Sequence, residues 1–343
     1  MRLCVIGCGE HATSSHGPSQ ARYAAEHGSL ELAGCCDVDG SRAEAYRVRF
    51  GFQRSYEDPI VMVDGESADA VAVVVADAAI CEVACRVLER GIPALIEKPP
   101  GRTTRELDAM SSAADRGRRD EPVPHQVAFN RRFAPLVREA RRRIDGFATT
   151  SAVQHVYYEM TRVNRRDPDF STTAIHGIDA VRYLAGSDFR HVRFRYQDLG
   201  QLGPGVANIF LDAVMASGAT AHLSFTPMAG AVVERATVHA QDRSLYLRIP
   251  MWSGFDAPGR LVHLEKGRVI ADLVGEASEP FVQGGFYGEY EAFLGDLAAG
   301  RSPSPSLRES RQSLEIAERI RAREGEFVSS IPPTGGTFRG VAS

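Results

Sequence analysis

The residues with the most evident chemistry lie in a glycine-containing turn, Gly7–Ala12, near the start of the chain. The turn follows the apolar run Leu3–Ile6 and precedes a helical pattern, which is the context of a dinucleotide-binding fingerprint. Gly7 permits the tight turn, Gly9 lets the backbone approach a pyrophosphate, and Ala12 allows close helix–strand packing. The pattern predicts that backbone N–H groups of this turn bind a pyrophosphate. The predicted cofactor-binding residues of the turn are Gly7, Cys8, Gly9, Glu10, His11 and Ala12.

A second motif, Glu97-Lys98-Pro99, follows the strand pattern Ala94–Ile96. The carboxyl ends of parallel strands share one edge of a sheet, so Lys98 is expected on the same edge as the glycine turn. A lysine there can stabilise an oxygen that gains negative charge and can act as an acid or base. We therefore predict that Lys98 is catalytic and contacts both cofactor and substrate. Glu97 is expected to anchor the turn or orient Lys98, on the cofactor side.

The choice between NAD and NADP depends on Asp37, which ends the second predicted strand. An acidic residue there can accept hydrogen bonds from the adenosine ribose and repels a 2′-phosphate. Asp39 adds to this effect, whereas Ser41 and Arg42 are able to support a phosphate. The sequence thus favours NAD without excluding NADP.

The elements around these motifs alternate between strand and helix in the first part of the chain, which predicts a doubly wound parallel sheet covered on both faces. The run Ala70–Val75 is continuously apolar, as in a strand buried on both sides. The other elements expected here are strands at 30–36 and 125–129 and helices at 41–50, 78–90 and from Thr103, which forms a capping box with Glu106.

The second part reads as successive strands, which predicts an α+β domain with a large, mostly antiparallel sheet. Strands are expected at 151–158, 191–196, 209–215, 219–225, 231–239, 244–249 and 261–265. Helices are expected at 171–184 and 307–323, the latter with a capping box of Ser306 and Glu309. The predicted domains are 1–125, which binds the dinucleotide, and 126–343, which binds substrate and supports oligomerisation, with its last helix returning to the body.

The composition argues against several classes of protein. A net charge of −4 over 343 residues gives no reason to expect nucleic acid or an anionic membrane as partner. We expect neither a secretory signal nor a membrane span, and hence a cytoplasmic protein. No pair of the six cysteines has the spacing of a zinc ribbon, so no metal is expected. Cys8 is expected to be reactive, since it lies in the predicted cofactor turn.

In its motifs the chain resembles the glucose–fructose oxidoreductase and inositol dehydrogenase (Gfo/Idh/MocA) family. The resemblance rests on Gly7–Ala12 with Asp37, on Glu97-Lys98-Pro99, on the segments 130–133 and 176–179, and on the closing stretch from Phe286. It implies an N-terminal Rossmann domain and a C-terminal domain on an open sheet that often forms homodimers or homotetramers. It also implies NAD- or NADP-dependent oxidation or reduction of sugars, cyclitols or related polyols.

The resemblance assigns a second catalytic residue, His176, on the helix expected at 171–184. Asp179 follows three residues later on the same face and could orient the imidazole. Many family members place an aspartate four residues before this histidine, where this chain has Thr172. A threonine cannot serve as a carboxylate base, so Lys98 and His176 are expected to manage the proton, with Thr172 and His176 also contacting substrate.

The other substrate candidates precede this helix. Arg162 and Arg165 carry guanidinium groups that could grip a carboxylate or phosphate, with a solvated loop as the equal alternative. Tyr158 is a candidate for recognising a hydroxyl group. Ala76, which follows the strand expected at 70–75, replaces a Thr-Pro segment common in the family and is expected to form part of the cofactor wall.

Three functions are compatible with this sequence. The leading hypothesis is an NAD(P)-dependent dehydrogenase or reductase that acts on the CH–OH group of a sugar, sugar acid or cyclitol. An NAD-dependent glycoside hydrolase would use the same architecture but regenerate its cofactor within each cycle. A non-catalytic dinucleotide or sugar sensor is the third hypothesis, favoured by Thr172 and Ala76 and disfavoured by Lys98 and His176.

Overall fold

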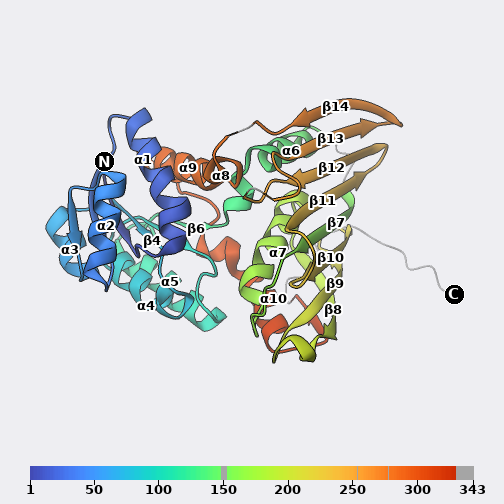
Figure 1. The fold of residues 1–343 in the computed structure, drawn as a ribbon, viewed down its shortest axis with the longest axis horizontal. Coiled ribbons are helices and arrows are strands. Elements are labelled where there is room, and N and C mark those ends of the chain that lie inside the picture. Colours follow the sequence, from blue (N-terminus) through green and yellow to red (C-terminus); the bar gives the residue numbers. More distant parts are fainter. Residues whose placement is uncertain (148–152, 253, 277, 330–343) are drawn as a thin grey trace. The chain divides into compact units, whose positions relative to one another are not determined.

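The computed structural model describes residues 1–147, 153–252, 254–276 and 278–329, which form two units (Figure 1). The first unit comprises Met1–Phe133 and Glu279–Leu314, and the second comprises Ala134–Ser278 and Glu315–Ser343. The boundary lies later than the predicted residue 125, because 125–128 is itself a strand of the first sheet. The last helix was expected to return to the body, but the inclusion of the residues before it, from Glu279 onward, in the first unit was not predicted.

The first unit is built on a parallel sheet with the strand order β3-β2-β1-β4-β5-β6. This is the doubly wound order in which ligands bind at the carboxyl ends of the strands, where the order reverses between β1 and β4. The predicted fold class is confirmed. The strands are β1 (Arg2–Ile6), β2 (Glu31–Cys36), β3 (Arg54–Tyr56), β4 (Ala70–Val73), β5 (Ala94–Glu97) and β6 (His125–Ala128).

Helices surround this sheet, and side-chain caps fix where several begin. Asp39 caps α2, Asp58 caps α3 and Thr103 caps α5, each through its side-chain oxygen. The helical elements are η1 (Ala12–His16), α1 (Gly17–Glu26), α2 (Gly40–Phe50), α3 (Pro59–Glu66), α4 (Asp77–Leu88), α5 (Thr104–Gly117), η2 (Asn130–Phe133), α8 (Pro280–Gln283) and α9 (Phe286–Ala298). The predicted helices α2, α4 and α5 are present, and the helix predicted after the glycine turn corresponds to η1 and α1, whereas α3, α8 and α9 were not predicted.

The late segment joins the first unit through its apolar face. In α9, Tyr290, Phe293 and Leu294 are buried in the same core as Leu3 and Val5 of β1. Beyond α9, the carbonyl of Pro305 accepts a hydrogen bond of 2.7 Å from the N–H of Val127 in β6. The segment therefore contributes both to the core of the first unit and to the hydrogen bonding of β6.

The second unit contains a larger sheet, with the order β14-β13-β12-β11-β7-β10-β9-β8-β15 among the described residues. All neighbouring pairs are antiparallel except β10 with β7. The strands are β7 (Val153–Thr161), β8 (Phe189–Asp198), β9 (Ala207–Met215), β10 (Thr220–Thr226), β11 (Val233–Ala240), β12 (Arg243–Ile249), β13 (Arg260–Glu265), β14 (Arg268–Val274) and β15 (Glu326–Val328). The first two residues of the strand predicted at 151–158 lie outside the described residues, and β14 and β15 were not predicted.

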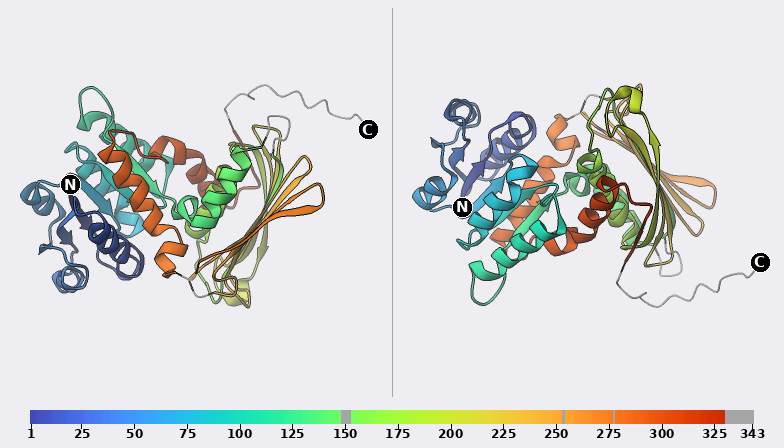
Figure 2. Two further views of the ribbon diagram at one scale, coloured as in Figure 1. Left: turned by 90° about the horizontal axis from the view of Figure 1, so that it is seen from above. Right: turned by 90° about the horizontal axis from the view of Figure 1, so that it is seen from below.

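Helices α6 (Pro135–Asp145) and α7 (Ser171–Ala185) pack on one face of this sheet (Figure 2). The remaining helical elements are η3 (Gly200–Leu202) and α10 (Leu307–Arg321), and the predicted capping box of α10 is confirmed by reciprocal hydrogen bonds between Ser306 and Glu309. The other face of the sheet exposes alternate side chains, including Tyr157, Val214 and Tyr246. None of the helices in the described ranges is long and apolar enough to cross a membrane.

The packing of α7 on the sheet depends on Gly177. A Cβ atom at this position would lie 2.7 Å from a ring carbon of Phe225 and 2.8 Å from one of Tyr158. Both rings are fully buried, so neither can move aside freely. Glycine is therefore required for the close approach of helix and sheet.

We expect Gly177→Ala to lower the free energy of unfolding by about 1–3 kcal/mol, because the methyl group overpacks the core. The matched control is Gly295→Ala in α9, where a Cβ atom would meet nothing within 4 Å. That change should leave stability equal or raise it, since alanine favours helix over glycine. Urea unfolding of both variants measures the difference, and equal stability of the two would refute the packing argument.

Candidate active site

The glycine turn lies at the carboxyl end of β1 and has the backbone that the sequence predicts. Gly7 has a φ of 99°, and a Cβ atom there would lie 2.0 Å from the carbonyl oxygen of Val74. Only glycine fits this position. A Cβ atom on Gly9 would meet nothing within 4 Å, so the backbone at Gly9 faces open space. The turn is thus tight on one side and accessible on the other.

Asp37 links this turn to the end of β2. Its Oδ2 accepts a hydrogen bond of 2.9 Å from the N–H of Cys8, and its Oδ1 accepts one of 2.9 Å from the N–H of Asp39. A guanidinium nitrogen of Arg42 lies 3.4 Å from Oδ1. Asp37 therefore holds a negative charge beside the turn, partly balanced by Arg42.

The other predicted cofactor residues differ in their exposure. Ala12 is buried, as close helix–strand packing requires, whereas Glu10 and Ala76 are exposed. Cys8 is buried, and its Sγ contacts the carbonyl oxygen of Cys36 at 3.5 Å. A hydrogen bond with Cys35, followed by burial, raises the pKa of the Cys8 thiol. A buried thiol with a raised pKa does not fit the reactivity expected of Cys8.

Glu97 is the last residue of β5, and its buried carboxylate organises the residues around it. One oxygen, Oε2, accepts a hydrogen bond of 2.8 Å from the N–H of Lys98. The other, Oε1, lies 2.9 Å from Nε2 of His16 and 3.1 Å from Nε2 of His11. The hydrogen bond from the N–H of Lys98 supports the expected role of Glu97 as an anchor of this turn. The Lys98–Pro99 peptide is cis.

A chain of hydrogen bonds continues from Glu97 into the core of the first unit. The hydroxyl of Tyr290 lies 3.0 Å from Nδ1 of His16 and accepts a bond of 2.7 Å from Nε2 of Gln20. The hydroxyl of Tyr46 in turn donates to Oε1 of Gln20 at 2.8 Å. These partners are consistent with a neutral His16 that accepts at Nδ1 and donates from Nε2.

The charge states of the central pair follow from their surroundings. Burial lowers the pKa of His16, with the opposing effect of Glu97 smaller. Burial would raise the pKa of Glu97, but His11 and His16 together hold it well below its ordinary value. The structure thus pairs a neutral imidazole with an ionised carboxylate one residue before Lys98.

Glu289 in α9 is a second buried carboxyl group in this unit, and both of its oxygens lack a hydrogen-bond partner among the described residues. Burial raises the pKa of Glu289 well above its ordinary value, and the charge of Glu97 raises it further against the effect of Arg131. These surroundings therefore favour the protonated form of Glu289.

The second unit holds the other predicted catalytic residue, His176, which is buried in α7. Thr172 lies in the first turn of the same helix. Asp179 is fully buried and has its carboxylate 3.9 Å from a guanidinium nitrogen of Arg182. The predicted cooperation of Lys98 with His176 involves both units and stays a prediction.

Two predicted substrate residues belong to the core of the second unit. Tyr158 is fully buried and donates from its hydroxyl to Glu234 at 2.9 Å. The guanidinium of Arg162, also buried, forms an ion pair with the same carboxylate. Both residues therefore have a structural role. Arg165 is more exposed and pairs with Asp167 at 2.8 Å.

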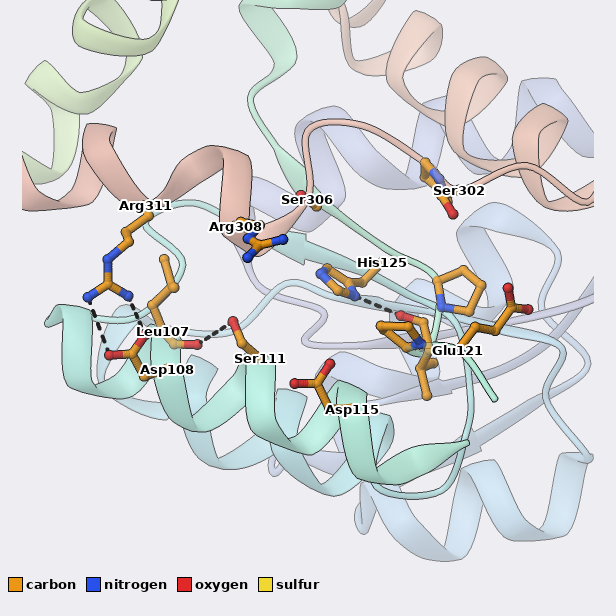
Figure 3. A pocket seen from close by; sticks show the side chains of 14 residues that line it. Leu107, Asp108, Ser111, Asp115, Glu121, His125, Ser302, Ser306, Arg308 and Arg311 are labelled. Atoms are coloured by element: carbon orange, nitrogen blue, oxygen red, sulfur yellow. Dashed lines mark hydrogen bonds and ion pairs between the residues drawn. The ribbon is translucent and has the colours of Figure 1, made fainter. Parts of the chain in front are cut away.

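One cavity of the first unit lies away from the glycine turn. Its volume is about 670 Å³, and it lies between α5 and the segment 302–311 (Figure 3). His125, one of its lining residues, is the first residue of β6. Because all strands of this sheet are parallel, the cavity is at the amino end of β6, opposite the edge that carries Gly7, Asp37 and Lys98. The cofactor-binding and catalytic residues predicted at Gly7, Asp37 and Lys98 are therefore not part of this cavity.

The residues at the carboxyl edge fit a dinucleotide. The open approach at Gly9 leaves room for a pyrophosphate, and η1 begins directly after the turn, so unpaired N–H groups of a helix start are available. Asp37 lies at the end of the adjacent strand, where the adenosine ribose is expected. Gly7, Gly9 and Asp37 would hold the cofactor.

Comparison with known families supports this assignment. Residues 1–119 match the profile of the GFO_IDH_MocA family, described as an oxidoreductase family with an NAD-binding Rossmann fold. The family match therefore covers the dinucleotide-binding part of the chain, and the description of that family agrees with the NAD-binding Rossmann fold predicted from the motifs.

Curated relatives match over part of the chain. Inositol 2-dehydrogenase 2 of Saccharopolyspora erythraea is 32% identical over 197 residues, which cover 55% of this chain and 55% of that protein. Levoglucosan dehydrogenase of Pseudarthrobacter phenanthrenivorans is 29% identical over 159 residues, which cover 42% of this chain and 40% of the relative. The chain thus spans about half the length of the curated relatives that it matches.

Solved structures match over nearly the whole chain. Levoglucosan dehydrogenase in complex with NADH and levoglucosan aligns with a TM-score of 0.79 at 20% identity, covering 96% of this chain and 100% of that chain. UDP-N-acetylglucosamine 3-dehydrogenase from Acidithiobacillus ferrooxidans aligns with a TM-score of 0.78 at 22% identity, covering 95% and 98%. At these sequence identities, the likeness shows a shared fold alone.

We expect Glu289→Gln to stabilise the protein increasingly as the pH rises. The pKa of Glu289 is raised in the folded state, so its contribution to stability is complete below the unfolded value of 4.5 and is lost as the pH rises toward the folded value. Glutamine has nearly the same shape as a protonated glutamic acid but does not ionise, so its contribution to stability does not fall as the pH rises. Urea unfolding at pH 4 and pH 8 should show a larger gain at pH 8.

The matched control for this prediction is Glu291→Gln, which changes an exposed carboxylate on the same helix. It should show no comparable gain at pH 8. A constant difference between Glu289→Gln and the native protein at both pH values would contradict a protonated Glu289.

Proposed function

Because residues 1–119 belong to the Gfo/Idh/MocA oxidoreductase family with its NAD-binding Rossmann fold, we propose that the whole chain is an NAD-dependent dehydrogenase. Its substrate class would be a sugar, a sugar acid or a cyclitol. Support comes from the curated relatives, whose names include inositol and levoglucosan dehydrogenases. When bound, NAD accepts or returns the hydride of a CH–OH group.

The observation that carries this proposal is the placement of Lys98. It follows β5 at the carboxyl edge of the sheet, and its backbone N–H is fixed by the ionised Glu97. Only Lys98 and Lys266 are lysines in a chain with 40 Lys and Arg residues. An arginine cannot give up its proton in a protein, whereas a lysine can. A lysine at this position is therefore suited to accept the proton of a substrate hydroxyl as the hydride leaves.

The second unit would supply the other groups that contact the substrate. His176 and Thr172 lie on α7, and Arg165 is the more exposed member of the predicted arginine pair. In this proposal His176 shares the proton with Lys98, while Thr172 and Arg165 recognise substrate oxygens. Tyr158 and Arg162 are held by Glu234 in the core of the same unit.

We further propose a cellular location and an oligomeric state for the enzyme. The six cysteines are free thiols in the described structure, as in a reducing compartment, which supports a cytoplasmic location. The exposed face of the second sheet carries Tyr157, Val214 and Tyr246, which supports a homodimer or homotetramer formed through this face. Sedimentation analysis would test the assembly.

We expect Lys98→Ala to lower kcat by about 10²–10⁴-fold, because the proton acceptor is removed. Lys98→Arg separates charge from proton transfer, since it keeps the positive charge but cannot accept a proton. It should be nearly as inactive as Lys98→Ala. The measurement is nicotinamide absorbance during turnover with a panel of polyols and sugar acids.

The control is Lys266→Arg, which changes the only other lysine, in the turn between β13 and β14. It should retain native turnover. Full activity of Lys98→Arg would leave Lys98 only an electrostatic role. Turnover without accumulation of free NADH would favour the glycoside hydrolase, and NADH binding without turnover on any substrate would favour the sensor.

Replacement of Asp37 tests the cofactor preference separately. We expect Asp37→Ser to weaken NAD binding by about tenfold, the effect of losing one hydrogen bond to a charged group, and to improve NADP binding relative to NAD. Arg42 would then keep its ion pair with Asp39 but lose the one with residue 37, and its guanidinium could approach a 2′-phosphate. Fluorescence titration with NADH and NADPH measures both effects, and an unchanged preference would exclude Asp37 as its determinant.

A further inference from the structure

We propose that the first unit carries a binding site for a divalent transition metal, represented by Zn²⁺, whose ligands are His11, His16 and Glu97. Nε2 of each histidine and Oε1 of Glu97 would be the ligand atoms. The two histidines lie in and just after the glycine turn, and the glutamate ends β5. The site adjoins the glycine turn and Lys98, but its proposal does not depend on the oxidoreductase function proposed above.

A local irregularity of the backbone brings the two histidines together. Residues Ala12–His16 form a π-helical turn, in which the N–H of Gly17 donates to the carbonyl of Ala12. Residues five apart lie on different faces of an α-helix, but an i→i+5 turn aligns them. The rings of His11 and His16 accordingly lie 5.2 Å apart between centroids. Such π-turns are frequent at functional sites.

The donor set and its spacing suit a metal ion. The two Nε2 atoms are 3.1 Å and 2.9 Å from Oε1 of Glu97, and the three ligand atoms lie within 4.8 Å of one another. In a tetrahedral Zn²⁺ site with bonds of about 2.0–2.2 Å, ligand atoms are about 3.3 Å apart. A small outward movement of the side chains would admit the ion. Two histidines and one glutamate are also the protein ligands of several zinc enzymes.

The outer contacts would hold these ligands in place. Nδ1 of His16 contacts the hydroxyl of Tyr290, and Oε2 of Glu97 accepts from the N–H of Lys98. When His16 binds the ion through Nε2, its proton moves to Nδ1 and donates to the Tyr290 oxygen. Phe286 lies 5.4 Å and 5.5 Å from the two imidazole rings and contributes an apolar wall.

The exposure of the ligands provides a route for the ion. His16 and Glu97 are buried, whereas the side chain of His11 is 48% exposed. An ion can therefore reach the site from the side of His11, and a water molecule can complete the coordination there. Imidazole and carboxylate ligands together favour Zn²⁺ and its first-row neighbours over Mg²⁺ or Ca²⁺.

The test is a titration of the full chain, freed of metal by chelation, with Zn²⁺ followed by calorimetry and with Co²⁺ followed by visible absorbance. We expect one equivalent to bind with micromolar affinity or tighter. His11→Gln and Glu97→Gln should each weaken binding by about tenfold or more. Thermal unfolding checks that both variants are folded, and His11→Gln changes a half-exposed side chain and so spares the core.

Two controls distinguish metal binding at this site from metal binding by other side chains. His27→Gln removes an exposed histidine of the same unit and should bind Zn²⁺ as the native protein does. The Co²⁺ spectrum should lack the near-ultraviolet thiolate band that binding at Cys81 and Cys85 would give. The proposal is overturned if the native chain shows no saturable binding, if the variants of His11 and Glu97 bind unchanged, or if a thiolate band appears.

Discussion

The buried carboxylate of Glu97 connects three parts of the first unit that are distant in the chain. It ends β5, it holds the N–H of Lys98, and it accepts from the histidines of the glycine turn and η1. Through His16 it is connected to Tyr290 of α9. An ionised carboxylate in a protein interior is costly unless every lone pair has a donor. This requirement fixes the positions of the surrounding elements.

The same constraint explains why the chain returns to its first unit. Residues 1–133 supply Gln20 and His16 but not the hydroxyl group that joins them, which comes from Tyr290. The adjacent Phe293 and Leu294 fill the apolar core beside this contact. The hydrogen bonds of Tyr290 and the burial of Phe293 and Leu294 thus both involve α9. Together they hold this helix in the first unit.

In the second unit, two polar residues that the sequence predicts to bind substrate are buried and contact other residues of the core. Arg162 and Tyr158 have the chemistry to bind a polar substrate, but both are committed to Glu234 inside the unit. Glu234 lies in β11, the neighbour of β7, and is itself fully buried. Breaking such a network by removing one member would leave an uncompensated charge in the core. Arg165, three residues after Arg162, remains more exposed.

The sequence by itself determined the two kinds of sheet, the glycine turn and the positions of Asp37 and Lys98. Local rules suffice for these, because hydrophobic periodicity, caps and the φ of Gly7 depend on nearby residues. Only the tertiary structure identified His16, Tyr290 and Glu289 as parts of the first unit's polar interior. No spacing rule predicts a π-turn that aligns His11 with His16, or a contact across 274 residues between His16 and Tyr290. Those relations exist only once apolar burial has folded the distant segments onto one sheet.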